Sequence, residues 1–297
     1  MNPLISICIP TKDRLKHLTA TVESIINDGV DVSLYEIVIS DNSDNDNIRI
    51  YCESLQANGY RVKHVKNPLL GFYNSIVSLR EASGSLLKLH NDYSCFVKGQ
   101  FSFMIKLVQE NINDMPTIFF SNGTLGFNVN KLCSSKDDFF SKTHFQNTWS
   151  SAFSIWKKDF DLVPHERENL DSMFPHTSIL LNCIKENYLI CDYVIFENIS
   201  VSGKGGYNLF DCFCNRYLNM LRAKVKSSEL TNKTFRRIKW KMFLDFVTPW
   251  YYKTVSTDQG FTFDVTNADG IIKKNYGILP YYVMLTVCKI KKIISRR

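Results

Sequence analysis

Two clusters of polar side chains follow apolar runs and could bind a ligand or transfer protons. His90-Asn91-Asp92 comes directly after the apolar run at residues 86–89, and Asp41-Asn42-Ser43 follows the run at residues 35–39. Carboxylates and imidazoles bind divalent cations and act as general bases, and a carboxylate also accepts hydrogen bonds from ligand N–H groups. Because open parallel sheets bind ligands beyond the carboxyl ends of their strands, both clusters are candidates for one site.

The pattern of apolar residues predicts an α/β protein that would place these clusters together. Strands are predicted at residues 4–9, 35–39, 60–65, 86–89, 117–120, 150–156 and 188–196. Helical spacing of apolar residues predicts helices at residues 15–26, 47–57, 72–82, 96–110, 175–183, 210–226 and 233–247. Strands that alternate with helices favour a mostly parallel sheet with right-handed crossovers. Residues 122–138 are polar and irregular, so we expect a loop there.

Composition narrows the class of protein. The formal charge of +7 fits an anionic substrate or membrane surface and does not by itself indicate nucleic acid. Nine cysteines without a C-x-x-C pair suggest free thiols in a reducing compartment. The first apolar run lacks a preceding basic region, so we expect a strand there and not a signal peptide. No apolar run approaches the length of a membrane span.

Four motifs in order carry a family resemblance. They are Ile9-Pro10-Thr11-x-x-Arg14, Glu36-Ile37-Val38-Ile39-Ser40-Asp41-Asn42-Ser43, Asn67-x-x-x-Gly71-x-x-Asn74, and Ala82-x-Gly84 with the later Asp92. In this order and spacing they resemble family 2 glycosyltransferases of the GT-A fold, and most of all the abequosyltransferase-like enzymes of bacterial O-antigen assembly. The resemblance covers about the first hundred residues well and residues 150–187 loosely.

The resemblance implies a site for a nucleotide-sugar donor. Asp41 would accept a hydrogen bond from a base N–H, and Pro10 and Thr11 would lie against the base. Arg14 could pair with Asp41 or reach a phosphate. The other donor-site residues that we expect from these motifs are Asn42 and Asn74. The alternative is that residues 41–43 form only a turn and that Arg14 is a solvated residue at a helix start.

The metal cluster departs from the family pattern. The family has Asp-x-Asp or Asp-Asp-Asp where this chain has His90-Asn91-Asp92. The last carboxylate, Asp92, is retained, and one carboxylate can suffice for Mn²⁺ or Mg²⁺ when phosphates and waters complete the shell. His90 would favour Mn²⁺ as a second ligand. The alternative for His90 is a satisfied polar residue at a strand end.

An inverting transferase needs a base that deprotonates the acceptor hydroxyl. The family supplies an Asp from a Glu-Asp pair just before a helix, and this chain has no such pair there. The candidates are Asp171 first, because it keeps the carboxylate chemistry, then His176 and Glu168. A simple N-cap is the alternative role for Asp171.

The C-terminal third has a different composition. We predict a catalytic domain at residues 1–205 and a basic, mainly helical region at residues 206–297. Lys204 in a Gly-rich stretch could meet the donor diphosphate. Residues 281–297 are amphipathic, with Val283, Val287, Ile290 and Ile294 on one face and lysines beside it. They suit an anionic membrane surface, and a solvated helical cap is the alternative.

The sequence therefore predicts a glycosyltransferase that moves a sugar from a nucleotide donor to a hydroxyl of a surface polysaccharide intermediate. The resemblance implies inversion and a polyprenyl-diphosphate-linked oligosaccharide acceptor. It also implies a cytoplasmic location at the inner face of a bacterial plasma membrane. The alternatives are a nucleotidyltransferase, and a binding protein for sugar nucleotide or glycan that does not turn over.

Overall fold

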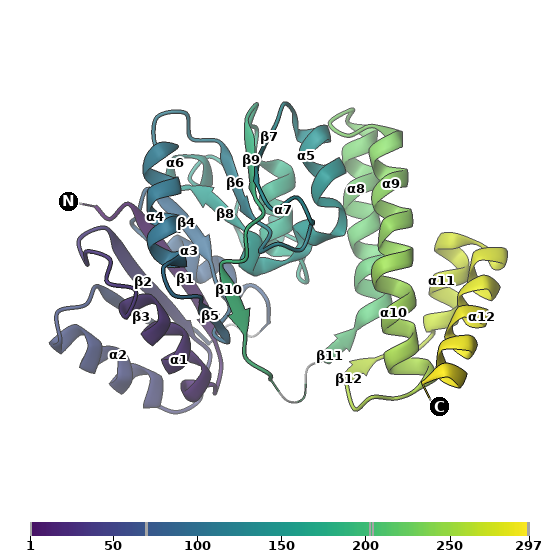
Figure 1. Cartoon of the computed structure of the whole chain (residues 1–297), viewed down its shortest axis with the longest axis horizontal. Coiled ribbons are helices and arrows are strands. Elements are labelled where there is room, and N and C mark those ends of the chain that lie inside the picture. The colour runs from purple at the N-terminus through teal and green to yellow at the C-terminus, as the bar shows by residue number, and fades with distance from the viewer. Residues whose placement is uncertain (1, 69–70, 202, 204, 296–297) are drawn as a thin grey trace. The chain divides into compact units, whose positions relative to one another are not determined.

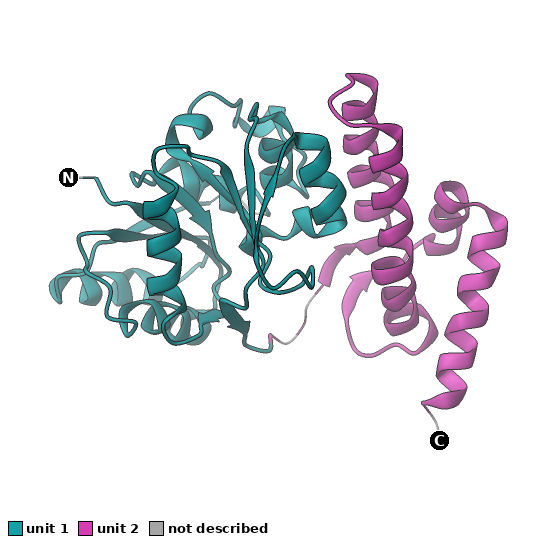
Figure 2. Ribbon diagram, turned by 45° about the horizontal axis from the view of Figure 1, so that its top comes forward, with its two compact units in different colours: residues 1–200 teal, residues 201–297 magenta. Residues whose placement is uncertain are grey.

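The computed structural model describes residues 2–68, 71–201, 203 and 205–295. Contacts divide the chain into two compact units, Met1–Ser200 and Val201–Arg297 (Figure 2). The sequence places this boundary between residues 205 and 206. Each unit is described by itself below.

The first unit is built on a mostly parallel sheet of five strands with the order β3-β2-β1-β4-β8 (Figure 1). β4 lies beside β1, parallel to it, and β8 is antiparallel to β4. The mixed α/β fold predicted from the sequence is confirmed. The bounds are β1 (Ile5–Thr11), β2 (Tyr35–Asp41), β3 (Val62–Lys66), β4 (Leu86–Leu89) and β8 (Ser154–Trp156).

Helices cover both faces of this sheet. Ile5, Ile7 and Ile9 of β1 belong to one buried cluster with side chains of α1 (Leu15–Ile26), α2 (Asn47–Ala57) and α4 (Gln100–Glu110). Successive side chains of a strand point to opposite faces. Ser40, which neighbours the clustered Ile39, contacts Asn74 of α3 (Asn74–Arg80), so α3 covers the other face.

The rest of the first unit differs from the prediction in three places. The expected loop at 122–138 contains β7 (Asn130–Cys133) and the start of α5 (Lys136–Thr143). Residues 150–152 are a 3₁₀ turn, so only β8 remains of the strand expected at 150–156. The strand expected at 188–196 is broken into β9 (Tyr188–Cys191) and the start of β10 (Phe196–Asn198). β6 (Thr117–Phe120), β9 and β7 form a small sheet in the order β6-β9-β7, and β10 pairs with β5 (Ser94–Phe96).

A buried carboxylate at the end of β9 organises the loop before β7. Asp192 is fully buried and accepts hydrogen bonds from the Ser121 hydroxyl at 2.6 Å and from the backbone N–H groups of Phe127 at 2.5 Å and Leu125 at 3.2 Å. These bonds hold the residues that precede β7 against the end of β9.

We expect Asp192→Ala to lower the free energy of unfolding by about 3 kcal/mol, because it leaves several buried donors without an acceptor. Urea denaturation of the two proteins measures this difference. Glu197→Ala, at an exposed position of β10, is the control and should change stability by less than about 0.5 kcal/mol. Equal midpoints for Asp192→Ala and the parent would contradict the prediction.

The second unit is mainly helical. Its helices are α8 (Leu218–Lys226), α9 (Asn232–Met242), α10 (Thr248–Tyr251), α11 (Ala268–Tyr276) and α12 (Ile278–Ile294). Two π-helical segments, Phe243–Val247 and Tyr252–Ser256, flank α10, which contains Pro249. A proline cannot donate a backbone hydrogen bond, and π segments absorb such an irregularity. The second unit also holds a third π segment, Asp211–Tyr217, and its strand β11 (Gly205–Asn208) pairs with β12 (Thr262–Asp264). The short helices α6 (Lys157–Phe160) and α7 (Pro175–Asn182) belong to the first unit.

Candidate functional site

The carboxyl ends of β1, β2 and β4 bring both polar clusters to one edge of the sheet. Thr11 is in register with Asp41, and the backbone N–H of Asn42 donates to the Thr11 carbonyl at 3.0 Å. On the other side of β1, the backbone N–H of His90 donates to the Cys8 carbonyl at 2.9 Å. These bonds extend the ladders past the strand ends and fix the polar residues that follow.

Asp92 forms a buried polar centre at this edge. The Thr11 hydroxyl donates to its Oδ2 at 2.7 Å, and the Arg14 guanidinium lies 3.1 Å from its Oδ1. Burial raises the pKa of Asp92, and the charge of Arg14 opposes that rise. The sequence left open whether Arg14 pairs with Asp41 or reaches a phosphate. In this structure Arg14 pairs with Asp92. Its guanidinium also stacks over the Tyr93 ring, 5.7 Å from the centroid.

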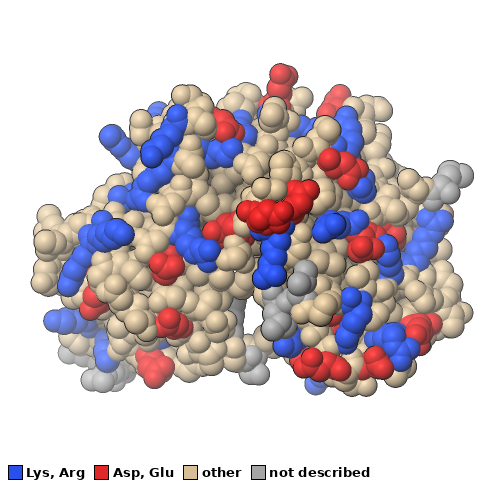
Figure 3. All heavy atoms as spheres, turned by 180° about the vertical axis from the view of Figure 1, so that it is seen from behind, with Lys and Arg blue, Asp and Glu red and all other residues tan. Residues whose placement is uncertain are grey.

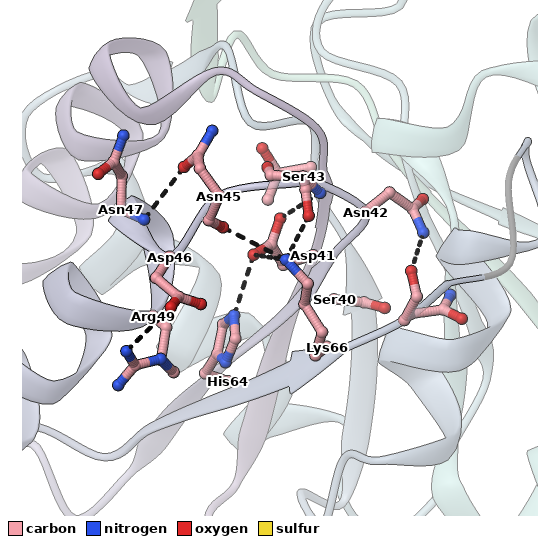
Figure 4. Close-up of polar contacts among 12 residues, drawn as sticks. Ser40, Asp41, Asn42, Ser43, Asn45, Asp46, Asn47, Arg49, His64 and Lys66 are labelled. Carbon is pink, nitrogen blue, oxygen red and sulfur yellow. Dashed lines mark hydrogen bonds and ion pairs between the residues drawn. The ribbon is translucent and has the colours of Figure 1, made fainter.

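Asp41 is the centre of a second network (Figure 4). Its side chain is fully buried, and its Oδ1 accepts from the backbone N–H of Ser43 at 2.8 Å. Oδ2 lies 3.1 Å from His64 Nε2 and 3.9 Å from Lys66 Nζ. The ammonium of Lys66 also donates to the carbonyl of Ser43, so one cation holds both the carboxylate and the turn behind it.

His64 and Lys66 are site residues that the sequence reasoning missed. They alternate along β3 and therefore point to one side of the strand. The register pairs Asp41 with Lys66 across β2 and β3. The available signal was two basic residues at alternate positions in the strand that must neighbour Asp41.

Asn74 and Asn42 hold the loops of the site. Asn74 Oδ1 accepts from the Ser40 hydroxyl at 2.5 Å and from Asn67 Nδ2 at 3.0 Å, and its Nδ2 donates to the Ser40 carbonyl at 2.9 Å. The Asn42 side chain donates to the Asn67 carbonyl. Both residues are mostly buried, so this geometry supports a positioning role for them. Pro10 is partly exposed at the end of β1.

His90 faces the interior of the first unit. Its Nε2 lies 2.7 Å from the Ser94 carbonyl, and its ring stacks on Phe96 with centroids 4.7 Å apart. Burial, with a contribution from nearby Lys88, lowers the pKa of His90 to about 3. Its Nδ1 is buried and has no hydrogen-bond partner among the described residues. This geometry favours a structural role for the neutral ring.

The described residues do not fit a metal centre built from side chains. Among residues 2–68, 71–201, 203 and 205–295, no group of three His, Cys, Asp or Glu side chains could hold an ion. Asp92 offers a carboxylate, but Thr11 and Arg14 already contact its two oxygens. Asn91, between the two predicted ligands, contacts Ser150 and Tyr93.

The three candidates for a catalytic base lie around the start of α7. Asp171 is partly exposed, and its Oδ1 accepts from the backbone N–H groups of Met173 at 2.8 Å and Phe174 at 3.0 Å. His176 is buried, with Nε2 at 2.9 Å from the Thr148 carbonyl, and burial lowers its pKa to about 4. Glu168 is exposed on the short 3₁₀ helix Arg167–Asn169.

One segment connects α7 with the cluster after β4. The Thr148 carbonyl contacts His176, and two residues later the Ser150 hydroxyl donates to Asn91 Oδ1 at 3.0 Å. The next residue, Ser151, accepts the backbone N–H of Asn91 at 3.1 Å. Residues 148–151 thus join the helix that carries the base candidates to the edge that carries Asp92.

Lys88 is a second residue that the sequence reasoning missed. It is fully buried in β4, and its ammonium donates to the carbonyls of Leu89, at 2.5 Å, and Ser151. Burial lowers the pKa of Lys88 to about 7. The side chain therefore ties the end of β4 to the segment that holds Asn91. The signal was a lysine inside a strand that is otherwise all leucine.

Buried histidines make the stability of the fold pH-dependent. The pKa is lowered to about 3 for His90 and to about 4 for His176, so the unfolded chain binds more protons than the folded one below pH 6.5. For each of these two histidines, protonation in the unfolded chain should lower the free energy of unfolding by about 2 kcal/mol between pH 7 and pH 5. His176→Gln can still donate to Thr148 but cannot titrate. Denaturation at pH 7 and pH 5 should show that the free energy of unfolding falls by about 2 kcal/mol less in the variant than in the parent. An equal fall in the two proteins would contradict this account.

Lys204, predicted to meet the donor diphosphate, lies outside the described residues. Sequence reasoning placed the remaining candidates in two groups, and the structure keeps those groups. Thr11, Arg14, Asp41, Asn42, Asn74 and Asp92 lie at the carboxyl edge of the large sheet, and Asp171, His176 and Glu168 lie around α7.

Comparisons with known proteins identify a family domain and similar folds. Residues 6–115 match the model of Glycosyl transferase family 2. No curated protein matches the sequence significantly. The fold is similar to that of S. aureus TarS 1–349 in complex with UDP-GlcNAc, with a TM-score of 0.62 and 13% identity over 93% of this chain and 82% of that one.

Two further solved structures show the same likeness. The longer S. aureus TarS matches with a TM-score of 0.58 and 13% identity over 92% of this chain, which spans 48% of that protein. The mannosyltransferase PcManGT from Pyrobaculum calidifontis, in complex with GDP-Man and Mn²⁺, matches with a TM-score of 0.54 and 11% identity over 99% of this chain and 81% of that one. The chain therefore has a GT-A fold, as the sequence predicted, and its residues 6–115 match the Glycosyl transferase family 2 model.

Proposed function

We propose that this protein is a glycosyltransferase, which moves a sugar from a nucleotide-sugar donor to a hydroxyl of a lipid-linked intermediate of a bacterial surface polysaccharide, with inversion. One observation supports it most. Two buried carboxylates, Asp41 at the end of β2 and Asp92 after β4, lie beyond the strands on either side of β1, and each is held by a cation from an adjacent element. Such an edge can recognise the base at one end and the diphosphate at the other.

The donor would bind along this edge. Asp41 would accept a base N–H, and His64 and Lys66 would hold its carboxylate in place. Pro10 and Thr11 would lie against the base. Arg14 is about one third exposed beside Asp92, so its guanidinium can still turn toward a phosphate. TarS has been solved with UDP-GlcNAc and with UDP, and PcManGT with GDP-Man, which supports a nucleotide-sugar donor here.

A divalent cation, Mn²⁺ or Mg²⁺, remains part of the proposal only as an ion that arrives with the diphosphate. Asp92 would then be its single protein carboxylate, since His90 is buried against Phe96. PcManGT was solved with Mn²⁺. Neutralisation of the leaving diphosphate is the chemistry that such an ion supplies. Arg14 and Lys204 are the residues of this chain that would share this charge.

The proposed acceptor rests on the resemblance to abequosyltransferase-like enzymes and on the basic C-terminal unit. A polyprenyl-diphosphate-linked oligosaccharide would be presented at the inner face of the plasma membrane. No helix in the described part of the chain is long and apolar enough to cross a membrane. Contact with the bilayer would therefore be peripheral for this part of the chain.

The test is a thermal-shift panel with UDP, GDP, CDP and dTDP, each with Mn²⁺, Mg²⁺ or EDTA. A ligand at about a hundred times its Kd should add about 2.7 kcal/mol of stability. A melting shift with one nucleotide, seen only when metal is present, would identify the donor class and support Asp92 as the metal anchor. The same shift in EDTA would assign the diphosphate to the basic residues. No shift with any nucleotide would overturn the proposal.

Donor hydrolysis separates the transferase from a binding protein of the same fold. The altered metal cluster and the missing Glu-Asp pair are the observations that favour the binding protein. A transferase releases free sugar slowly from its donor when no acceptor is present, and a binding protein releases none. A nucleotidyltransferase would instead form a sugar nucleotide from a nucleoside triphosphate and a sugar phosphate.

A further inference from the structure

Helix α12 carries apolar residues on two opposite faces. Tyr281, Met284 and Cys288 are at most 4% exposed and face the rest of the second unit. The opposite face holds large apolar side chains that are between 48% and 75% exposed, and we name six of them the α12 outer stripe: Leu279, Tyr282, Val283, Val287, Ile290 and Ile294. They recur every third or fourth residue, so they form one continuous strip along the helix.

The packing of α12 does not use this stripe. The sequence predicts that Val283, Val287, Ile290 and Ile294 share a face, and that face could either join a core or meet a membrane. All four side chains are exposed by about half or more. A solvated cap would carry polar residues here. Contiguous exposed apolar patches on soluble proteins usually mark a surface that binds something.

The charge around the stripe selects the kind of partner. Residues 270–297 contain seven Lys and Arg residues and no Asp or Glu. Lys289 and Lys291 are exposed on the same helix, and Lys291 also lies over the Tyr252 ring at 4.8 Å. Lys292 donates to the Ser256 carbonyl at 2.6 Å, which fixes the last turn against the unit. Positive charge recurs over the face of the molecule in Figure 3, but acidic residues interrupt it there.

A second copy of the chain would fit this surface poorly. Two α12 outer stripes placed together would bring two basic segments without acidic residues into contact, and like charges repel. A bilayer with anionic lipids offers an apolar layer for the stripe and negative headgroups for the lysines. A tyrosine within the stripe, Tyr282, has the amphipathic character that suits the interface.

We propose that the α12 outer stripe lies in the surface of an anionic lipid bilayer, with α12 parallel to the membrane plane. The inference rests on the proposed function, because that function places the acceptor in a membrane. It goes further in naming the helix face that makes the contact. Apolar burial holds the helix in the interface, and the nearby lysines add electrostatic attraction to an anionic surface.

Flotation of the full chain with lipid vesicles tests the proposal. The parent should bind vesicles of phosphatidylcholine with 30% phosphatidylglycerol, and the binding should fall as salt is raised. The variant Val283→Ser, Val287→Ser, Ile290→Ser should lose at least tenfold in vesicle binding. Its melting temperature should stay close to the parent's, because the three positions are exposed.

A matched variant controls for lost surface hydrophobicity. Leu132→Ser, Leu162→Ser, Ile184→Ser changes three apolar residues of the first unit that are at least 72% exposed, and it should bind vesicles like the parent. Equal binding by the α12 variant and the parent would overturn the proposal. Binding to pure phosphatidylcholine vesicles at the same strength would overturn its electrostatic part. A parent dimer that the α12 variant abolishes, without vesicle binding, would assign the stripe to self-association.

Donor hydrolysis in solution keeps this test apart from the proposed function. The α12 variant should hydrolyse the donor at the parent's rate when no vesicles are present. If the parent protein binds vesicles but neither binds nor hydrolyses any nucleotide sugar, the membrane surface is supported and the proposed transferase function is overturned. Donor hydrolysis by a parent protein that does not bind vesicles would support the transferase and overturn the membrane surface.

Discussion

Asp92→Asn should lower kcat/KM for sugar transfer by about 10²- to 10³-fold, the usual cost of removing one group that controls charge at a reacting centre. Asp92 is the retained carboxylate after β4, and its two oxygens contact Thr11 and Arg14. Asparagine keeps the shape and can still accept from Thr11. The variant therefore removes the negative charge with little change in packing. A radiolabelled-donor transfer assay at several donor concentrations measures the effect.

Asp13→Asn is the matched control for Asp92→Asn. Asp13 lies two residues after Thr11, near the same edge of the sheet, but it is exposed. Its substitution should change kcat/KM by less than about twofold, because exposed charges interact weakly. If Asp92→Asn keeps full activity, the edge around Asp92 is not the place of the reaction. If added Mn²⁺ restores the variant partly, the carboxylate acts through a cation that comes with the donor.

The sequence predicted the large sheet well because its strands are buried on both faces. β1, β2 and β4 are short apolar runs that end in turn residues, and each starts or ends within two residues of its predicted bound. Family motifs then located Asp41 and Asp92 at the strand ends. The sequence could not tell which cation meets which carboxylate. Arg14 lies next to Asp92 through the register of β1 and β4, and register is a property of the folded sheet.

Prediction failed where a polar side chain replaces backbone pairing. Asp192, which is buried, and Asn122, which is partly buried, have oxygens that accept several backbone N–H groups, so they join segments that a local pattern does not connect. Lys88 lies inside β4, which was predicted correctly, but its bond with the Ser151 carbonyl was not foreseen. Each of these polar residues bonds with a segment far away in the sequence. A local pattern carries no information about such a partner.

Replacement of Asp171 should separate catalysis from capping. If Asp171 is the base, Asp171→Asn should lower kcat by about 10²- to 10⁴-fold and leave the donor KM nearly unchanged, because the amide cannot take a proton from the acceptor. The amide oxygen can still accept from the backbone N–H groups of Met173 and Phe174, so the start of α7 should keep its stability. Rapid-quench or steady-state kinetics with acceptor at saturation gives kcat directly.

Asp171→Ala completes the comparison, because it removes the cap as well as the carboxylate. It should cost about 1 kcal/mol of stability in addition to the loss of kcat. A residue that only caps the helix would give the opposite pattern, with Asp171→Asn near parent activity and only the alanine variant impaired. His176→Gln should keep most of the activity, because an imidazole with a pKa near 4 is a weak base and its Nε2 is already engaged by Thr148. An inactive His176→Gln beside a fully active Asp171→Asn would transfer the role of base to the histidine.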